Sequence, residues 1–263
     1  MRYIKYILLL SIIFFSCDEI NNVSDFSNDF TFICVLKNDQ IVQRAYLYKS
    51  IGIKDFLSPN SAFIPNAEIT LSDGTLSSQL QVSAPEYMYS DDSVFYGNIL
   101  PNKKYDIQVK VNNEIVTGST TAPGEFSINL SQNDTIYPYR DTDRYPSFYD
   151  RYHSYQFSWT ESANSFQYLV FAVLTYRSND GNEREFYTST IYTTDTVATI
   201  DFPSHTSFNG KEHYNYLIRF IVVSIDKNYY DHLLLSRDRA GLSSQYGVFG
   251  SSIIESCVAY VKY

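Results

Sequence analysis

Residues 104–121, KYDIQVKVNNEIVTGSTT, form two alternating runs on either side of an Asn112-Asn113 pair. In the first run, every second residue from Tyr105 to Val111 is apolar, and the residues between them are Asp, Gln and Lys. A period of two indicates a strand with one buried face and one solvent-facing side. Asparagine tolerates the backbone of a tight turn, so the segment predicts a β-hairpin in an antiparallel sheet.

Similar alternation occurs in the residues before this hairpin. The run 67–72 ends at an Asp73-Gly74 pair, which is typical of a turn between two strands. About seven short strands separated by turn signals predict an immunoglobulin-like β-sandwich over residues 29–124. The order PNAEITLSDG then YGNILPNKKYDIQVKVNNE is similar to the carboxypeptidase-regulatory or transthyretin-like variety. The other strands expected here are 30–37, 42–49, 79–83 and 93–96.

The second half of the chain, residues 125–263, also has the patterns of strands. The positions of Trp159, Tyr168 and Tyr216 resemble those of aromatic residues in fibronectin type III domains. We therefore predict an all-β protein of two antiparallel β-sandwich domains with one short helix near the C-terminus. The strands expected in this half are 155–160, 166–176, 186–193, 196–201, 214–226 and 253–261.

One helix is expected over residues 228–238. Tyr229 and Leu233 fall on one face at helical spacing, and Gly241 is expected to end the helix as a C-terminal cap. A turn around residues 247–250 is then expected to lead into the last strand.

The N-terminus has the features of a secretory signal peptide over residues 1–16. Arg2 and Lys5 give it a positive start, and the apolar run 6–15 follows. This run is shorter than the roughly 20 residues that a membrane-spanning helix requires.

Cys17 follows the small residue Ser16 and resembles the lipidated cysteine of bacterial lipoproteins, although Phe14 stands where leucine is usual. Lipidation would hold the chain to a membrane, because acyl chains bury many methylene groups in the bilayer. The alternative is a cleaved secretory signal with an incidental cysteine. Residues 17–28 are polar and are expected to form a tether, and Asp18 and Glu19 resemble the signal that directs Bacteroidota lipoproteins to the cell surface.

The composition restricts the classes of partner. The chain has 263 residues, 25 of them tyrosine, and a net charge of −9. Binding to nucleic acid needs a basic surface that replaces counterions on phosphate, so no nucleic-acid partner is expected.

Outside the signal region two cysteines remain, Cys34 and Cys257. Outside the cytoplasm they could form a disulfide, or they could be separate buried thiols. Sequence alone leaves both alternatives open.

Sequence motifs for catalysis or metal binding are missing. No G-x-S-x-G elbow, P-loop or G-x-G-x-x-G occurs, and no two histidines have the i, i+4 spacing of a helical zinc motif. We therefore expect a non-enzymatic protein with no cofactor and no metal site. The four histidines are His153, His205, His213 and His232.

Two groups of aromatic residues are candidates for binding, because tyrosine offers a wide contact area and a hydroxyl group. The first lies in the tyrosine-rich connector 131–153 and comprises Tyr145, Tyr149 and Tyr152. The alternative for this group is packing between the two domains. The second group is expected to bind or to cover one end of the sandwich, and it comprises Tyr229, Tyr230, Tyr246 and Phe249.

The order of several motifs resembles the family called domain of unknown function 4249 from Bacteroidota. The motifs are SC followed by acidic residues, PNAEITLSDG, ILPNKKYDIQVKV, TAPGEF, FSWTESANSFQYLV, VVSIDKNYYDHL and YGVFGSSIIESC. The resemblance implies a surface lipoprotein of the outer membrane, often encoded beside TonB-dependent receptors, with no established activity.

From this resemblance and the lipid anchor we expect an accessory of a TonB-dependent uptake system that contacts the receptor barrel or its cargo. The alternative is a surface module that binds a glycan or a peptide through exposed tyrosines. A hydrolase with a scattered site is a third hypothesis.

Overall fold

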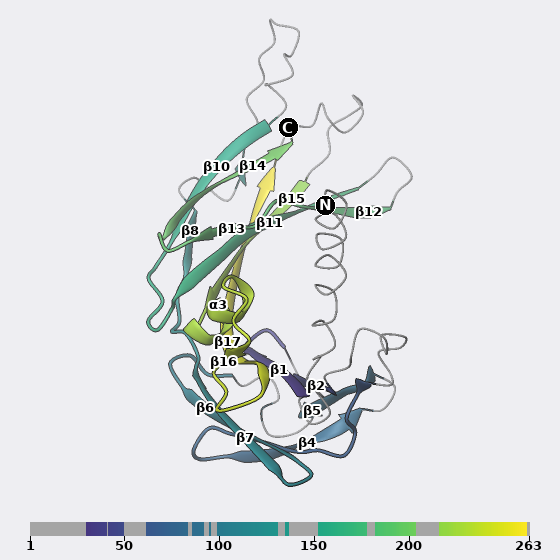
Figure 1. Ribbon diagram of the computed structural model, residues 1–263. Helices are drawn as coiled ribbons and strands as arrows, with labels where there is room; N and C mark the ends of the chain where they lie inside the picture. Colours follow the sequence, from purple (N-terminus) through teal and green to yellow (C-terminus); the bar gives the residue numbers. More distant parts are fainter. Residues whose placement is uncertain are drawn as a thin grey trace, which may run out of the picture.

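The computed structural model describes residues 30–40, 42–49, 62–83, 86–91, 95, 99–130, 135–136, 152–177, 182–203 and 216–261. Strands dominate these residues, in agreement with the predicted all-β class, and one short helix, α3, lies near the C-terminus (Figure 1). In the described part of the chain, no helix has the length and apolar character needed to span a membrane.

The N-terminal half is a sandwich whose two layers are joined by β4. The first part of β4 pairs with β3, and its last residues, Gln81–Ser83, pair with β5, so the strand passes from one layer to the other. The strands are β1 (Phe30–Lys37), β2 (Gln43–Lys49), β3 (Glu68–Ser72), β4 (Ser77–Ser83), β5 (Met88–Asp91), β6 (Lys104–Val111) and β7 (Glu114–Thr121).

Alternation along these strands builds the core between the layers. On β1, every second side chain from Phe30 to Leu36 is buried, and on β6 the same holds from Tyr105 to Val111. The hairpin of β6 and β7 has the predicted bounds, because its apolar period of two is unbroken along β6. Strand β5 was not predicted.

The C-terminal half has two layers that meet on aromatic rings. Phe157 of β10 lies 4.8 Å from Phe220 of β15 between ring centroids, and Trp159 lies 5.4 Å from Tyr168 in an edge-on arrangement. One layer consists of β8 (Ile128–Leu130), β10 (Tyr152–Trp159) and β14 (Val197–Pro203). The other contains β11 (Gln167–Arg177), β12 (Glu183–Tyr187), β13 (Ile191–Thr193), β15 (Tyr216–Ile225) and β17 (Tyr246–Val261), with β9 (Thr135–Ile136) and β16 (Arg239–Ala240) at the ends of β17.

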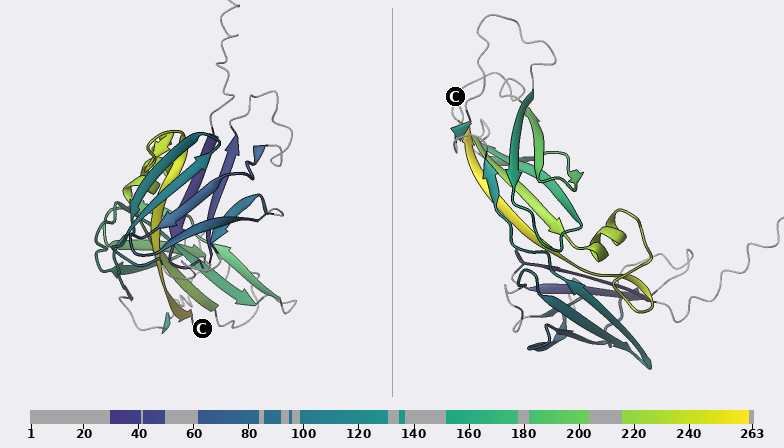
Figure 2. Two further views of the ribbon diagram at one scale, coloured as in Figure 1. Left: turned by 90° about the horizontal axis from the view of Figure 1, so that it is seen from below. Right: turned by 90° about the vertical axis from the view of Figure 1, so that its left-hand side faces the viewer.

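Strand β17 belongs to both halves (Figures 1 and 2). Its residues Tyr246–Ser252 pair in parallel with β1, and its residues Ser252–Val261 pair in antiparallel fashion with β15. The predicted boundary between residues 124 and 125 therefore does not separate the strand pairing of the two halves.

The turn expected around residues 247–250 is wrong, because Gly247 and Gly250 lie within β17. A Cβ atom at Gly247 would lie 1.8 Å from the carbonyl oxygen of Phe32, and one at Gly250 would lie 2.9 Å from the backbone nitrogen of Tyr229. These glycines let β1 and the helix approach the strand closely. Glycine within a strand can therefore mark the close approach of another backbone and need not mark a turn.

Three further expectations need correction. The strand expected at 186–193 is two short strands, β12 and β13, both paired with β11. The helix α3 covers Lys227–Leu233 and its C-cap is Leu234, so Gly241 does not end it. Of the expected strand 93–96, only Phe95 lies within the described residues, and it is buried without forming a strand.

Cys34 and Cys257 are not joined by a disulfide. Cys34 lies beside Phe249 of β17, and Cys257 is eight residues further along that strand, a separation on the order of 25 Å. A disulfide needs Cα atoms within about 7 Å, so the alternative of separate thiols holds. Burial raises the pKa of the Cys34 thiol to about 12, which keeps it protonated.

Candidate functional site

Helix α3 lies where the two halves meet, and a buried carboxylate fixes its start. Asp226 accepts a hydrogen bond from the backbone nitrogen of Tyr229 at 2.8 Å as the N-cap of the helix. Its other oxygen accepts from the hydroxyl of Thr120 on β7, and that hydroxyl lies 3.0 Å from the hydroxyl of Ser251 on β17. Burial raises the pKa of Asp226, and the hydrogen bonds partly oppose this shift.

The residues after α3 cover the open edge of β7. The backbone nitrogen of Ser119 donates to the carbonyl of Gly241 at 3.2 Å, and the nitrogen of Ser243 donates to the carbonyl of Thr117 at 2.7 Å. Asn228 adds a bridge, because its side-chain nitrogen donates to the carbonyls of Ser119 and Phe249. An uncovered edge strand would be a template for pairing with other chains, and this contact closes it.

A polar depression of about 800 Å³ lies between this covering segment and the outer face of β6. Nine of its thirteen lining residues carry a hydroxyl, an amide or a charge, and we call it the polar cradle. It offers hydrogen bonds to a polar ligand but has no aromatic ring in its lining. The lining includes Thr70, Lys104, Asp106, Gln108, Asn228 and Ser243.

A smaller depression of about 210 Å³ lies on the outer face of β1 and β2, and Tyr229 of α3 forms part of its lining. It combines two aliphatic side chains, two tyrosines, one amide and two cations, and we call it the tyrosine groove. Burial is the main cause that raises the pKa of Tyr229, and the nearby Tyr192 raises it further, so the hydroxyl stays neutral. The lining residues are Ile33, Val35, Lys37, Gln40, Arg44, Tyr46 and Tyr229.

Large apolar side chains are exposed on and beside α3, and we call this set the α3 face. The ring of Phe166 is 42% exposed and lies 4.6 Å from the ring of Tyr230 between centroids. The ammonium group of Lys227 lies 5.4 Å from the centre of the Phe166 ring. Leu233 and Leu235, 38% and 48% exposed, complete the set.

The structure separates the second group of predicted binding residues. Phe249 is fully buried in the core, so its prediction as a contact residue is wrong. Its place at the end of the expected turn suggested exposure, but it lies in β17 beside Cys34. Tyr246 has the guanidinium of Arg239 over its ring at 5.8 Å, Tyr229 lines the tyrosine groove, and Tyr230 belongs to the α3 face.

The first group is placed only in part. The backbone of Tyr152 begins β10, whereas Tyr145 and Tyr149 lie outside the described residues. The lipidation candidate Cys17 also lies outside them. Of the histidines, His205 and His213 lie outside as well.

Several residues of these surfaces were missed at the level of sequence, namely Lys37, Arg44, Tyr46 and Phe166. A signal was present for Arg44 and Tyr46, because they alternate with the buried residues Gln43, Ala45 and Leu47 on β2. The period of two placed them on one outer face, but it did not show that Tyr229 of α3 would line a depression on that face.

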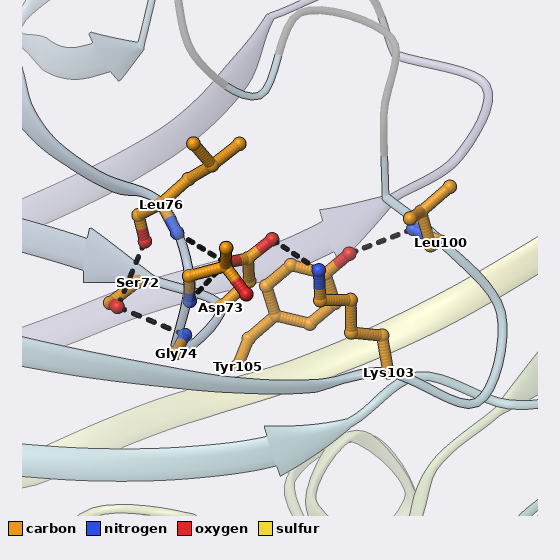
Figure 3. A network of polar contacts seen from close by, with 8 residues as sticks. Ser72, Asp73, Gly74, Leu76, Leu100, Lys103 and Tyr105 are labelled. Atoms are coloured by element: carbon orange, nitrogen blue, oxygen red, sulfur yellow. Dashed lines mark hydrogen bonds and ion pairs between the residues drawn. The ribbon is translucent and has the colours of Figure 1, made fainter.

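A second carboxylate network stabilises the turn between β3 and β4 (Figure 3). One oxygen of Asp73 accepts from the backbone nitrogens of Thr75 and Leu76 at 2.8 and 2.7 Å, and the other lies 2.5 Å from the ammonium of Lys103. The hydrogen bond from Leu76 and the contact with Lys103 lower the pKa of Asp73 to about 2. The network is local to the turn and to the loop before β6.

Among the described residues, no three metal-ligating side chains come together. Asp226 and Asp73 are each engaged by hydrogen bonds within the fold, and the buried Asp231 of α3 pairs with Lys227 at 2.5 Å and with Arg237 at 3.2 Å. These three acids therefore have structural roles, and the two depressions and the α3 face are the surfaces suited to contact other molecules.

Comparison with solved structures gives distant likenesses. The chain is similar to trypsin-activated alpha-2-macroglobulin from Escherichia coli at 8% identity and a TM-score of 0.31, over 89% of this chain and 16% of that one. For the FN1–FN3 domains of chicken CNTN1, the identity is 10% and the TM-score 0.28, over 88% and 63% of the two chains. For CBD12 from CALX1.2, the identity is 11% and the TM-score 0.24, over 89% of this chain and 98% of that one.

No curated protein matches the chain in sequence. A family model does match, over residues 20–247, and its description is "Domain of unknown function (DUF4249)". Because the match covers most of the chain, the protein belongs to the DUF4249 family.

Proposed function

We propose that the protein is a non-enzymatic lipoprotein of the outer membrane, anchored at the cell surface through Cys17, that serves a TonB-dependent uptake system as an accessory. Its contact with the receptor barrel is made through the α3 face. The family membership and the signal-like N-terminus support the location, and the exposed side chains beside α3 support the contact.

The single observation that carries the contact is the exposure of Phe166, Leu233 and Leu235 around a short helix. Aromatic side chains are enriched at protein interfaces, and the fully buried centre of an interface is more apolar than the rest of the surface. Lys227, which lies beside Phe166 and pairs with Asp231 at 2.5 Å, adds charged groups at the edge of the same surface, where a polar rim is usual.

Crosslinking in intact cells followed by purification of the full-length protein tests this proposal. The wild type is expected to recover a barrel protein, and Phe166→Ser together with Leu235→Asp is expected to reduce that recovery about tenfold, because a charge is placed in an apolar contact. Ile115→Ser is a matched control, since Ile115 is an exposed aliphatic residue at the β6–β7 hairpin. Recovery of no barrel by the wild type, or equal losses in both variants, would reject the contact.

The anchor is tested separately. Cys17→Ala is expected to move the protein out of the membrane fraction, because the acyl chains are lost. Mass spectrometry of wild-type protein should find the mature N-terminus at an acylated Cys17. An unmodified and uncleaved N-terminus would reject the lipoprotein part of the proposal without affecting the contact through α3.

A second candidate function is binding of a surface glycan or a peptide by exposed tyrosines. The observation that favours it is the exposure of Tyr187 on β12 and Tyr192 on β13, 59% and 49%. The hydroxyl of Tyr187 donates to Glu185 at 2.6 Å, which orients the ring at the surface. A glycan array with the wild type and with Tyr187→Ala tests this candidate, and binding that the variant retains in full would exclude this tyrosine.

A further inference from the structure

The tyrosine groove has a mixed lining that neither the proposed contact nor the fold requires. Its floor is the outer face of β1 and β2, where Ile33 lies directly opposite Tyr46. The ring of Tyr46 stacks on Tyr48 with 6.4 Å between centroids, and Tyr229 reaches the groove from α3. The apolar floor and the aromatic side chains together suit a small ligand group that is itself apolar or aromatic.

Two cations lie in the same lining. Lys37 ends β1 and Arg44 is the second residue of β2, and neither forms an ion pair with a carboxylate in the part of the chain that the structure describes. The chain as a whole has a net charge of −9, so two such cations in the lining of one groove depart from the general charge balance. A guanidinium group presents a planar fork that matches a carboxylate with two parallel hydrogen bonds.

The size of the groove limits its occupant. Pockets for drug-sized ligands usually have volumes of about 300–1,000 Å³, whereas this groove has about 210 Å³. It therefore holds one small group rather than a long chain, and the amide of Gln40 at its margin offers an additional hydrogen bond.

We propose that the tyrosine groove binds a small ligand that consists of a carboxylate attached to an apolar or aromatic group. The guanidinium of Arg44 and the ammonium of Lys37 bind the carboxylate. Ile33, Val35 and the two tyrosines contact the apolar or aromatic group. The ligand is either a free small acid or the C-terminal residue of a peptide. This inference goes beyond the proposed receptor contact and does not depend on it.

Titration calorimetry of the full-length protein tests the proposal with two pairs of probes. The first pair is indole-3-acetate and its neutral amide, and the second is a short peptide ending in phenylalanine with either a free or an amidated C-terminus. Binding of an acid with at least tenfold weaker binding of its amide supports the proposal, because the two probes differ in the charge that the cations recognise. The pair that binds identifies the source of the ligand.

Variants locate the site. Arg44→Gln and Lys37→Gln are each expected to weaken binding of the acid about 10- to 100-fold, as for the loss of a hydrogen bond to a charged group. Tyr229→Leu is expected to weaken binding of both acid and amide. Lys49→Gln is the matched control, because it removes one positive charge from the same strand but outside the groove.

Thermal unfolding of each variant confirms that it remains folded, since all four side chains are at least partly exposed. Absence of binding of both acids at millimolar concentration, equal affinity for acid and amide, or an equal loss in Lys49→Gln would overturn the proposal. None of these outcomes affects the crosslinking test of the α3 face. Failure of the carboxylate site can therefore be distinguished from failure of the receptor contact.

Discussion

Two carboxylates show how the same side chain has opposite effects on stability in different surroundings. Asp73 is stabilised as an anion by two backbone nitrogens and Lys103, whereas Asp226 is buried and its ionised form is disfavoured. The pKa of Asp73 is therefore below its ordinary value and that of Asp226 is above it. Their contributions to folding must change with pH in opposite directions.

Asp73→Ala is expected to destabilise the protein at pH 7 by about 1–2 kcal/mol, because two backbone nitrogens and an ammonium group lose their acceptor. The folded-state pKa is lowered from 3.8 to about 2, so this contribution is complete above pH 3.8 and is lost as the pH falls towards 2. Urea unfolding of both proteins at pH 7 and at pH 2.5 measures the difference, which should shrink at the lower pH. A constant difference would show that the stabilisation does not depend on the charge of Asp73.

For Asp226, the sign is reversed. Its folded-state pKa is raised, so the ionised form lowers stability at neutral pH, and this cost disappears as the pH falls through the folded-state pKa. Asp226→Asn keeps an N-cap acceptor and is expected to change stability at pH 7 by less than about 1 kcal/mol, while Asp226→Ala costs about 1–2 kcal/mol. Unfolding at several pH values compares them, and a loss in the Asn variant as large as in the Ala variant would contradict this account.

At the scale of the element, β17 depends on glycine where it passes β1. Gly247 has φ of +119° and lies against the backbone of Phe32, so Gly247→Ala is expected to destabilise the protein by about 3 kcal/mol or more, from backbone strain and a clash that side-chain motion cannot relieve. Gly74→Ala is the control. Gly74 also has a positive φ, +83°, but a Cβ atom there meets nothing within 4 Å, so only the strain of about 1 kcal/mol is expected.

Chemical denaturation of the two variants checks this difference. Similar losses in both would mean that the close approach to Phe32 is not what requires glycine at position 247.

The same strand shows what sequence could and could not predict. The hairpin of β6 and β7 was predicted to the residue, because its alternation depends only on neighbours along the chain. Gly247 and Gly250 were interpreted as a turn, since sequence gives no information about the strand and helix that lie against them. Phe249 was misplaced for the same reason.

The candidate surfaces were also predictable only where they depend on neighbours along the chain. Tyr229 and Tyr230 were identified from their helical spacing, and the structure places them on two different surfaces beside α3. Arg44 and Lys37 lie far from them in sequence, so their juxtaposition with Tyr229 depends on where α3 packs. Only the tertiary fold brings these groups together.

At the scale of the whole molecule, the two halves share one strand, and this predicts how the chain unfolds. A fragment of residues 29–124 would keep β2 as one partner of β1 but would lack its other partner β17, the segment that covers β7 and the helix that bridges them. It would then have unpaired edges on both layers, which favour aggregation over a stable sandwich. We expect this fragment to show no cooperative unfolding transition, whereas the full-length protein should unfold with β1 and β17 exchanging their amide hydrogens together.

A linked fragment tests whether the missing strand is the cause. Joining residues 226–252 to residue 124 through a flexible linker restores α3, the covering segment and the part of β17 that pairs with β1. Dispersed amide signals in its NMR spectrum and a cooperative thermal transition are expected for the linked fragment but not for residues 29–124 alone. If the shorter fragment gave both signals, the N-terminal sandwich would be an independent unit and β17 would only join it to the second half. The predicted outcome instead makes β17 a structural requirement of the first half, because its first seven residues complete a layer that the preceding strands leave open.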